Sequence, residues 1–80
     1  MEDPLDHIPF TELPMHGDPG SWKLKGPKQG SGVPATSPSA PPGTLKIYEI
    51  YKDEYGQEIE VHYFRHTDGT VSDVKVVPRS

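Results

Sequence analysis

The clearest alternation of hydrophobic and polar residues runs through residues 57–77, which read QEIEVHYFRHTDGTVSDVKVV. Asp68 and Gly69 stand near its centre, and both tolerate the positive φ that a two-residue type I′ hairpin turn requires. The pattern therefore predicts two antiparallel strands joined by this turn. Counting outward from a two-residue loop gives the pairs Thr67–Thr70, His66–Val71, Arg65–Ser72, Phe64–Asp73, Tyr63–Val74, His62–Lys75 and Val61–Val76.

Each of these strands is expected to have one hydrophobic and one polar face, because side chains alternate along a strand. The hydrophobic set is predicted to form a core and consists of Ile59, Val61, Tyr63, Val74 and Val76. The polar set lies on the opposite face and consists of Glu58, Glu60, His62, Phe64, His66, Asp73 and Lys75. We expect any chemistry to reside on the polar face, since most of the ionisable groups of these strands gather there.

Residues 44–52, TLKIYEIYK, are rich in β-branched and aromatic residues and predict a further strand. The connection to the next strand contains Gly56, which suits a left-handed backbone position. A three-residue loop closed by this glycine gives the pairs Lys52–Glu58 and Tyr48–His62. A two- or four-residue loop would instead turn Ile50 and Tyr48 toward the core. The first register is favoured because it pairs opposite charges across the strands.

The N-terminal half shows no such alternation and is dominated by proline and glycine. Residues 1–22 have a proline at every fifth position from Pro4, which leaves no room for a helix longer than one turn. We expect an extended arm with a tight turn at Asp18-Pro19-Gly20. Its side chains predicted to dock onto the sheet are Leu5, Ile8, Phe10, Leu13, Met15 and Trp22. The alternative is an arm that is disordered until it meets a partner. Residues 23–43 predict a flexible linker or a long mobile loop.

Together these patterns predict one small, mainly β domain over residues 1–80. It consists of the docking arm (1–22), the Pro/Gly/Ser-rich loop (23–43) and a sheet (44–78). The sheet is a three-stranded antiparallel meander with strands near 44–52, 57–66 and 70–77. With 31% hydrophobic residues and no cysteine, the chain has a small core and no disulfide or thiolate metal site to reinforce it.

The formal net charge is −4, from 12 acidic and eight basic residues. Strong nucleic-acid binders rely on Lys and Arg to neutralise phosphates, so the total charge argues against such a role, and we expect no binding to DNA. An enzyme that acts on RNA is still compatible with the negative net charge, because the charge of a local surface can differ from the total. No apolar run reaches the length of a membrane span, and the acidic, proline-broken N-terminus is not a signal peptide, so we expect no membrane segment.

The polar face of the predicted sheet carries the groups that metal-independent RNA cleavage needs. A base takes the proton of the ribose 2′-hydroxyl, an acid protonates the leaving 5′-oxygen, and a cation stabilises the charged phosphorane. Glu60 or His62 fits the base and His62 or His66 the acid. Lys75 or Arg79 fits the electrostatic group. The candidate RNA-binding residues are Tyr48, Phe64, Lys23, Lys25 and Lys28.

These polar residues also have a purely structural interpretation, since an antiparallel sheet with one solvent-facing side needs polar residues there. On a strand, His62 and His66 lie about 13 Å apart, which is too far to share a metal ion without a bulge. We therefore expect no metal and no other cofactor. Nucleophilic catalysis is also disfavoured, because the chain has no cysteine and the predicted register places no serine beside a histidine.

Short motifs in the chain resemble the catalytic domains of ribosome-inactivating colicins and, more broadly, the small C-terminal toxin domains of contact-dependent and other polymorphic bacterial toxins. The motif KIYE at 46–49, Gly56 and TDG at 67–69 stand at places comparable with the K-I-Y-E strand, Gly-containing turn and S-D-G turn of the family. The upstream segment DHIPFTE resembles the part that carries an Asp, a His and a Glu, and GPKQGSG is similar to the Pro/Gly/Lys-rich loop that follows. Arg79 stands near the place of the family's catalytic arginine.

The resemblance implies a ribonuclease that a cognate immunity protein holds inactive. It implies that the domain is the tail of a long secreted protein and acts on ribosomal or transfer RNA in the cytoplasm of a target cell. To the catalytic set from sheet geometry, Glu60, His62 and Lys75, it adds a second set: Asp6, His7, Glu12 and Arg79. The alternative hypothesis is a non-enzymatic β interaction module whose sheet edge or arm binds another protein. In this hypothesis strand 44–52 is an exposed edge able to accept an added strand.

Overall fold

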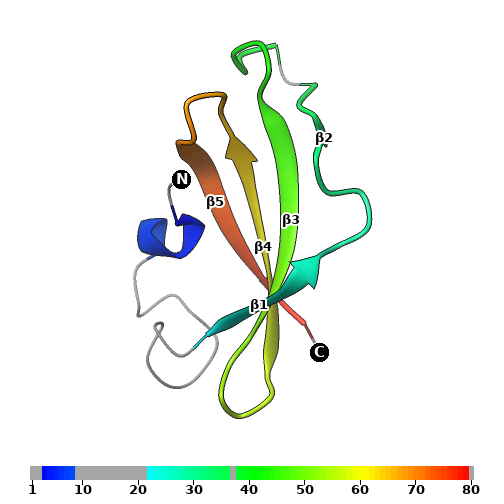
Figure 1. The fold of residues 1–80 in the computed structure, drawn as a ribbon, viewed down its shortest axis with the longest axis vertical. Coiled ribbons are helices and arrows are strands. Elements are labelled where there is room, and N and C mark those ends of the chain that lie inside the picture. Colours follow the sequence, from blue (N-terminus) through cyan, green and yellow to red (C-terminus); the bar gives the residue numbers. More distant parts are fainter. Residues whose placement is uncertain (1–2, 9–21, 37, 80) are drawn as a thin grey trace.

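The computed structural model describes residues 3–8, 22–36 and 38–79, and nearly all of its regular structure is β (Figure 1). The elements in chain order are the 3-10 helix η1 (Pro4–His7) and the strands β1 (Lys23–Pro27), β2 (Val33–Pro34), β3 (Leu45–Lys52), β4 (Glu58–Arg65) and β5 (Val71–Pro78). The strands form one open antiparallel sheet in the order β1-β3-β4-β5, and β2 also pairs with β3. The predicted mainly β fold is thereby confirmed, with β3, β4 and β5 as the three expected strands. Among the described residues no helix is long and apolar enough to cross a membrane.

The β3–β4 hairpin has the register that the charge pattern favoured, with the pairs Lys52–Glu58 and Tyr48–His62. The backbone N–H of Asp53 donates to the carbonyl of Gln57 at 2.9 Å, which closes a three-residue loop. Gly56 ends that loop with a φ of +85°, a conformation that favours glycine. The alternative two- and four-residue loops, which would have turned Ile50 and Tyr48 toward the core, are wrong.

The β4–β5 hairpin turns through three residues, not the two predicted. The backbone N–H of His66 donates to the carbonyl of Thr70 at 2.9 Å, and only Gly69 of the enclosed residues 67–69 has a positive φ. Asp68 favours this turn, because its Oδ1 accepts the backbone N–H and the hydroxyl of Thr70 at 3.0 and 2.6 Å. The predicted pairs nearest the turn are therefore wrong by one residue, and the observed pairs are Arg65–Val71 and Phe64–Ser72.

A β-bulge in β5 restores the predicted register farther from the turn. Asp73 and Val74 together stand opposite Tyr63, and beyond them lie the predicted pairs His62–Lys75 and Val61–Val76. Asp73 has a φ of 53° and is the one non-glycine residue with positive φ in the described chain. Between the turn and the bulge, each residue of β5 therefore lies on the face opposite to the predicted one. Val71 is therefore buried in the core, although the predicted register placed it on the polar face.

Residues 23–43 contain β1 and β2, which corrects the prediction of a flexible linker or mobile loop. β1 pairs with the second half of β3 and β2 with its start, so both cover the edge of β3 that faces away from β4. Between them, Ser31 Oγ accepts the backbone N–H of Tyr48 at 3.0 Å and takes the place of a strand carbonyl. The segment shows no hydrophobic alternation because most of its side chains stay exposed. β3 is therefore paired on both sides, and the expectation that it is an exposed edge is wrong.

One face of the sheet carries the hydrophobic core, made of Trp22, Ile47, Tyr51, Ile59, Val61, Tyr63 and Val71. The partly buried residues packed against it are Leu5, Ile8, Leu45, Val74 and Val76. The predicted docking of the arm is confirmed for Leu5, Ile8 and Trp22. Its other members lie outside the described residues: Phe10, Leu13, Met15 and the turn Asp18-Pro19-Gly20.

Two charged side chains also lie on the core side, next to a tyrosine. The hydroxyl of Tyr63 donates to the carboxylate of Glu49, and Arg65 Nη2 donates to the same hydroxyl at 2.9 Å. Burial and the hydrogen bond to Glu49 raise the pKa of Tyr63, so the phenol stays protonated. Buried polar groups need hydrogen-bond partners, and these bonds supply them for the hydroxyl of Tyr63 and the carboxylate of Glu49, whereas Arg65 Nε has no partner among the described residues.

Candidate functional site

The polar face of the sheet has an excess of positive charge, although the whole chain is acidic. Seven of the eight Lys and Arg residues lie on it: Lys23, Lys25, Lys28, Lys46, Lys52, Lys75 and Arg79. The carboxylates found there among the described residues are Glu58, Glu60 and Asp73. A local excess of positive charge is the pattern expected for a surface that contacts phosphate.

Glu60 is the centre of an ion-pair cluster on this face, and only 8% of the residue is exposed. Lys28 Nζ and Arg79 Nη1 each lie 3.0 Å from its Oε1, and His62 Nε2 lies 2.9 Å from its Oε2. These partners come from the loop after β1, from the end of β5 and from β4 itself. The carboxylate therefore joins three separate parts of the chain. The neighbouring Glu58 is paired with Lys25 at 2.7 Å.

The imidazole of His62 is oriented by this carboxylate. An ionised carboxylate only accepts hydrogen bonds, so Nε2 carries a proton and donates it to Glu60, while Nδ1 of the neutral ring is an acceptor. The ring also stands edge-on to Tyr48, with centroids 4.6 Å apart and an interplanar angle of 72°. A carboxylate that fixes the tautomer and orientation of a histidine is the arrangement used in general base catalysis.

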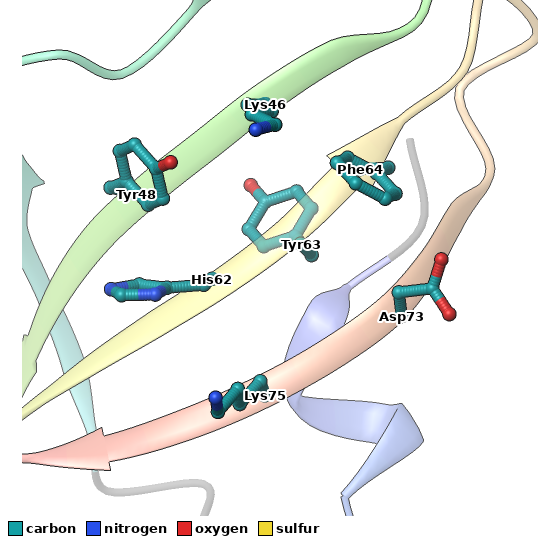
Figure 2. Close-up of a pocket in the computed structure, with 7 residues that line it drawn as sticks. All are labelled: Lys46, Tyr48, His62, Tyr63, Phe64, Asp73 and Lys75. Carbon is teal, nitrogen blue, oxygen red and sulfur yellow. The ribbon is translucent and has the colours of Figure 1, made fainter. Parts of the chain in front are cut away.

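A shallow hollow of about 200 Å³ opens beside His62 (Figure 2). Three strands line it, with the residues Lys46 and Tyr48 of β3, His62, Tyr63 and Phe64 of β4, and Asp73 and Lys75 of β5. Figure 2 shows Tyr48, His62 and Lys75 toward one end, and Phe64 and Asp73 toward the other. Aromatic surface, two ammonium groups and an oriented imidazole thus meet within one small area.

Most of the sequence-predicted site residues come together on this face. Glu60 contacts both His62 and Arg79, and Lys75 pairs with His62 across β4 and β5. Arg79 therefore belongs with the sheet set and not with a separate set in the arm. Of the predicted RNA-binding residues, Tyr48 and Phe64 line the hollow, Lys25 and Lys28 bind the two glutamates of β4, and Lys23 is exposed in β1.

The arm residues are not brought to this cluster. Asp6 and His7 belong to η1, which packs on β5 and whose neighbours Leu5 and Ile8 contact the core. In Figure 2 this helix lies behind β5 as seen from the hollow. Glu12 lies outside the described residues.

His66 is held at the end of the hairpin and does not line the hollow. Its Nδ1 lies 3.1 Å from Thr44 Oγ1, and its Nε2 lies 2.8 Å from Ser72 Oγ. The expectation that no serine stands beside a histidine is therefore wrong, because the three-residue turn moves Ser72 to the face of His66. Thr44 is 3% exposed, and the three side chains fasten the start of β3 to the β4–β5 hairpin.

Three residues of the hollow were missing from the predicted site: Lys46, Tyr63 and Asp73. Tyr63 was expected on the core face. Lys46 could have been found, since it stands two positions before Tyr48 and strand alternation puts both on one face. Asp73 was expected on the polar face, but its place at the rim of the hollow depends on the bulge. No local sequence pattern predicts that bulge.

The function has to be inferred from this geometry. A comparison of the chain with protein-family models, with curated proteins and with solved structures finds no match. Within the residues that the structure describes, no group of three or more His, Asp or Glu side chains is arranged to hold a metal ion. The polar face does offer a surface with an excess of positive charge and a histidine whose Nε2 is hydrogen-bonded to a carboxylate.

We expect acid to destabilise the fold through this face, because ion pairs hold the pKa of Glu60 and Glu58 below the ordinary value. The main cause is the hydrogen bond from His62 for Glu60 and that from Lys25 for Glu58. A pKa lowered by folding stabilises the protein above the ordinary value of 4.5, and this contribution is lost as the pH falls through the lower folded value. The free energy of unfolding, measured in urea, should therefore fall below about pH 4.5.

The matched control is Glu60→Gln, which cannot titrate at this position. Its free energy of unfolding should depend less steeply on pH in the acid range than that of the wild type. Equal slopes for the two proteins would contradict the role given to the Glu60 ion pairs.

Proposed function

We propose that this chain is a toxin domain that cleaves ribosomal or transfer RNA without a metal ion. The observation that carries the proposal is the Glu60–His62 hydrogen bond of 2.9 Å beside a cationic hollow with aromatic walls. The charge distribution supports it, since the cationic excess lies on the same face. The resemblance to colicin-type toxin domains points to the same activity.

In the proposed step, neutral His62 takes the proton of a ribose 2′-hydroxyl at Nδ1, and the 2′-oxygen attacks the adjacent phosphorus. The bond from phosphorus to the 5′-oxygen breaks, which leaves a 2′,3′-cyclic phosphate. The 5′-oxygen takes its proton from the ammonium group of Lys75, the cross-strand neighbour of His62. Lys46, on the β3 side of the hollow, stabilises the charged phosphorane.

Glu60 acts through His62 and not as the base itself. Its lowered pKa makes it a weaker base than an ordinary carboxylate, and its Oε2 is already bonded to His62 Nε2. Its negative charge keeps the imidazole in one tautomer and stabilises the imidazolium that forms. Arg79 and Lys28 hold this carboxylate in place, so they position the pair.

RNA is favoured over DNA as the substrate because this chemistry needs the 2′-hydroxyl as the nucleophile. The rings of Tyr48 and Phe64 suit single-stranded RNA, where stacking of a base on an aromatic side chain contributes about 1–3 kcal/mol. A domain of this kind needs an inhibitor in the cell that makes it. We expect a cognate immunity protein that covers the polar face, and delivery as part of a larger secreted protein.

The test is to incubate the purified chain with ribosomes and with transfer RNA in the presence of a metal chelator. We expect cleaved RNA whose fragments end in 2′,3′-cyclic phosphate, and protection when an immunity protein encoded beside the domain is added. The absence of cleavage in both RNAs, or activity that disappears with the chelator, would overturn the proposal. A His62→Ala protein purified in parallel controls for contaminating ribonucleases.

A further inference from the structure

At the end of the hollow away from His62 lie the ring of Phe64 and the carboxylate of Asp73, and this carboxylate has no partner among the described residues (Figure 2). The other two carboxylates of the polar face, Glu58 and Glu60, are both bound by cations. Asp73 is exposed and forms no hydrogen bond or ion pair with any described residue. Its two oxygens are therefore available to a ligand that lies on Phe64.

The backbone of Asp73 is held in a left-handed conformation, which is energetically unfavourable for a residue other than glycine. Its φ of 53° lies in the left-handed region, where a non-glycine residue is disfavoured, although Asp and Asn are more tolerant than most. The bulge formed with Val74 redirects the side chain relative to a regular strand. A strained backbone that presents an unpaired carboxylate at the rim of a hollow is typical of a binding residue.

The hydrogen-bonding pattern of a carboxylate distinguishes between the four bases. Guanine presents two adjacent donors, N1–H and the N2 amino group, which match two carboxylate oxygens. Adenine and cytosine each present one amino donor beside a ring acceptor, and uracil presents a single N3–H between two carbonyl acceptors. Only guanine satisfies both oxygens of Asp73 while its ring stacks on Phe64.

The spacing along β4 connects this end of the hollow to the reacting groups. Phe64 and His62 lie two residues apart on the same face, which corresponds to about 6–7 Å. That separation suits one nucleotide, with its base at Phe64 and its 2′-hydroxyl and 3′-phosphate near His62 and Lys75. We infer that Asp73 and Phe64 form a guanine-selective site and that the RNA is cut on the 3′ side of guanosine. The position of the cut, unlike the base selection, rests on the proposed ribonuclease function.

The base selection can be tested without relying on cleavage, by NMR titration of the full chain with guanosine, adenosine and inosine 3′-monophosphates. Wild-type protein should bind the guanosine nucleotide about ten-fold more tightly than the adenosine nucleotide, as expected for one bidentate contact. The inosine nucleotide should fall between them, because it keeps N1–H and lacks the amino group. Equal affinities for guanosine and adenosine nucleotides would overturn the inference.

Two variants at this position separate base recognition from the structural role of the bulge. Asp73→Asn keeps a residue type that tolerates the left-handed backbone, but its carboxamide pairs one acceptor with one donor and should reverse the preference toward adenine. Asp73→Gly also keeps the backbone and should remove the preference altogether. If either variant changes only the melting temperature and retains the guanine preference, Asp73 has a structural role and the inference is wrong.

Sequencing the fragment ends separates this inference from the ribonuclease proposal. Cleavage that leaves all four bases equally at the 3′ ends would support the ribonuclease and overturn guanine selection. A guanine preference in the titration without cleavage of any RNA would leave the binding site in place and overturn the ribonuclease.

Discussion

His62→Ala should lower the rate of RNA cleavage by about 10²–10⁴-fold, the usual contribution of a general acid or base. The fold should survive, because the His62 side chain is 29% exposed and Glu60 keeps its pairs with Lys28 and Arg79. The cleavage rate is measured as the initial rate on a short RNA. The survival of the fold is checked by thermal unfolding followed by circular dichroism. A variant as active as the wild type would remove His62 from the mechanism.

Two controls make this result specific to the imidazole of His62. His7→Ala removes the same side chain from η1, which packs on β5 and does not line the hollow, and should leave the rate unchanged. Added imidazole should restore part of the rate of the His62→Ala protein, since a small base can enter the vacated space. A structural defect would not respond to imidazole.

Trp22→Ala should lower the free energy of unfolding by about 3–5 kcal/mol, the usual cost of removing a large aromatic side chain from a core. Only 6% of Trp22 is exposed, and it belongs to the main hydrophobic cluster. A core of this size contributes roughly 3–5 kcal/mol without further reinforcement. The variant is therefore expected to be largely unfolded at 25 °C, which urea denaturation and the dispersion of amide signals in NMR spectra would reveal.

The matched control lies two residues away, at the start of β1. Leu24 is 52% exposed, so Leu24→Ala should change the free energy of unfolding by less than about 0.5 kcal/mol. Trp22→Phe should lower the free energy of unfolding much less than Trp22→Ala, because Trp22 Nε1 has no hydrogen-bond partner within the described residues. Similar effects of Trp22→Ala and Leu24→Ala would contradict the assignment of Trp22 to the core.

The distribution of charge matters more for the proposed function than the total. From the sequence, a net charge of −4 argued against a surface for nucleic acid. The sheet separates the charges: acidic residues such as Glu49 and Asp53 lie off the polar face, while most of the lysines lie on it. Register, and not composition, thus creates the local cationic excess that the ribonuclease proposal requires.

The two hairpins show how far local patterns determine the fold. For β3 and β4, opposite charges at Lys52 and Glu58 selected the correct register, because a shifted loop would have lost that pair. For β4 and β5, Asp68-Gly69 suits both a two-residue and a three-residue loop. The contacts of Asp68 with Thr70 and the bulge at Asp73 decide between them, and both depend on the folded backbone.

The contacts around Glu60 could not be predicted, because its partners are distant in the sequence. Lys28 is 32 residues away and Arg79 is 19 residues away. Lys28 reaches Glu60 only because β1 pairs with β3. This pairing is made by backbone groups, so the sequence of a segment rich in glycine and proline does not predict it. Lys28 was expected to meet RNA, and the structure shows that it binds a carboxylate.

The sequence by itself determined that β3, β4 and β5 form strands and that Glu60, His62 and Phe64 share a face, because alternation is a local property of an extended chain. The tertiary structure alone decided which cations surround Glu60, that His66 binds Thr44 and Ser72 instead of lining the hollow, and that a bulge at Asp73 replaces the predicted pair Phe64–Asp73. These arrangements depend on strand pairing across the sheet and on a one-residue bulge. Both are set by the path of the whole chain, so no short stretch of residues encodes them.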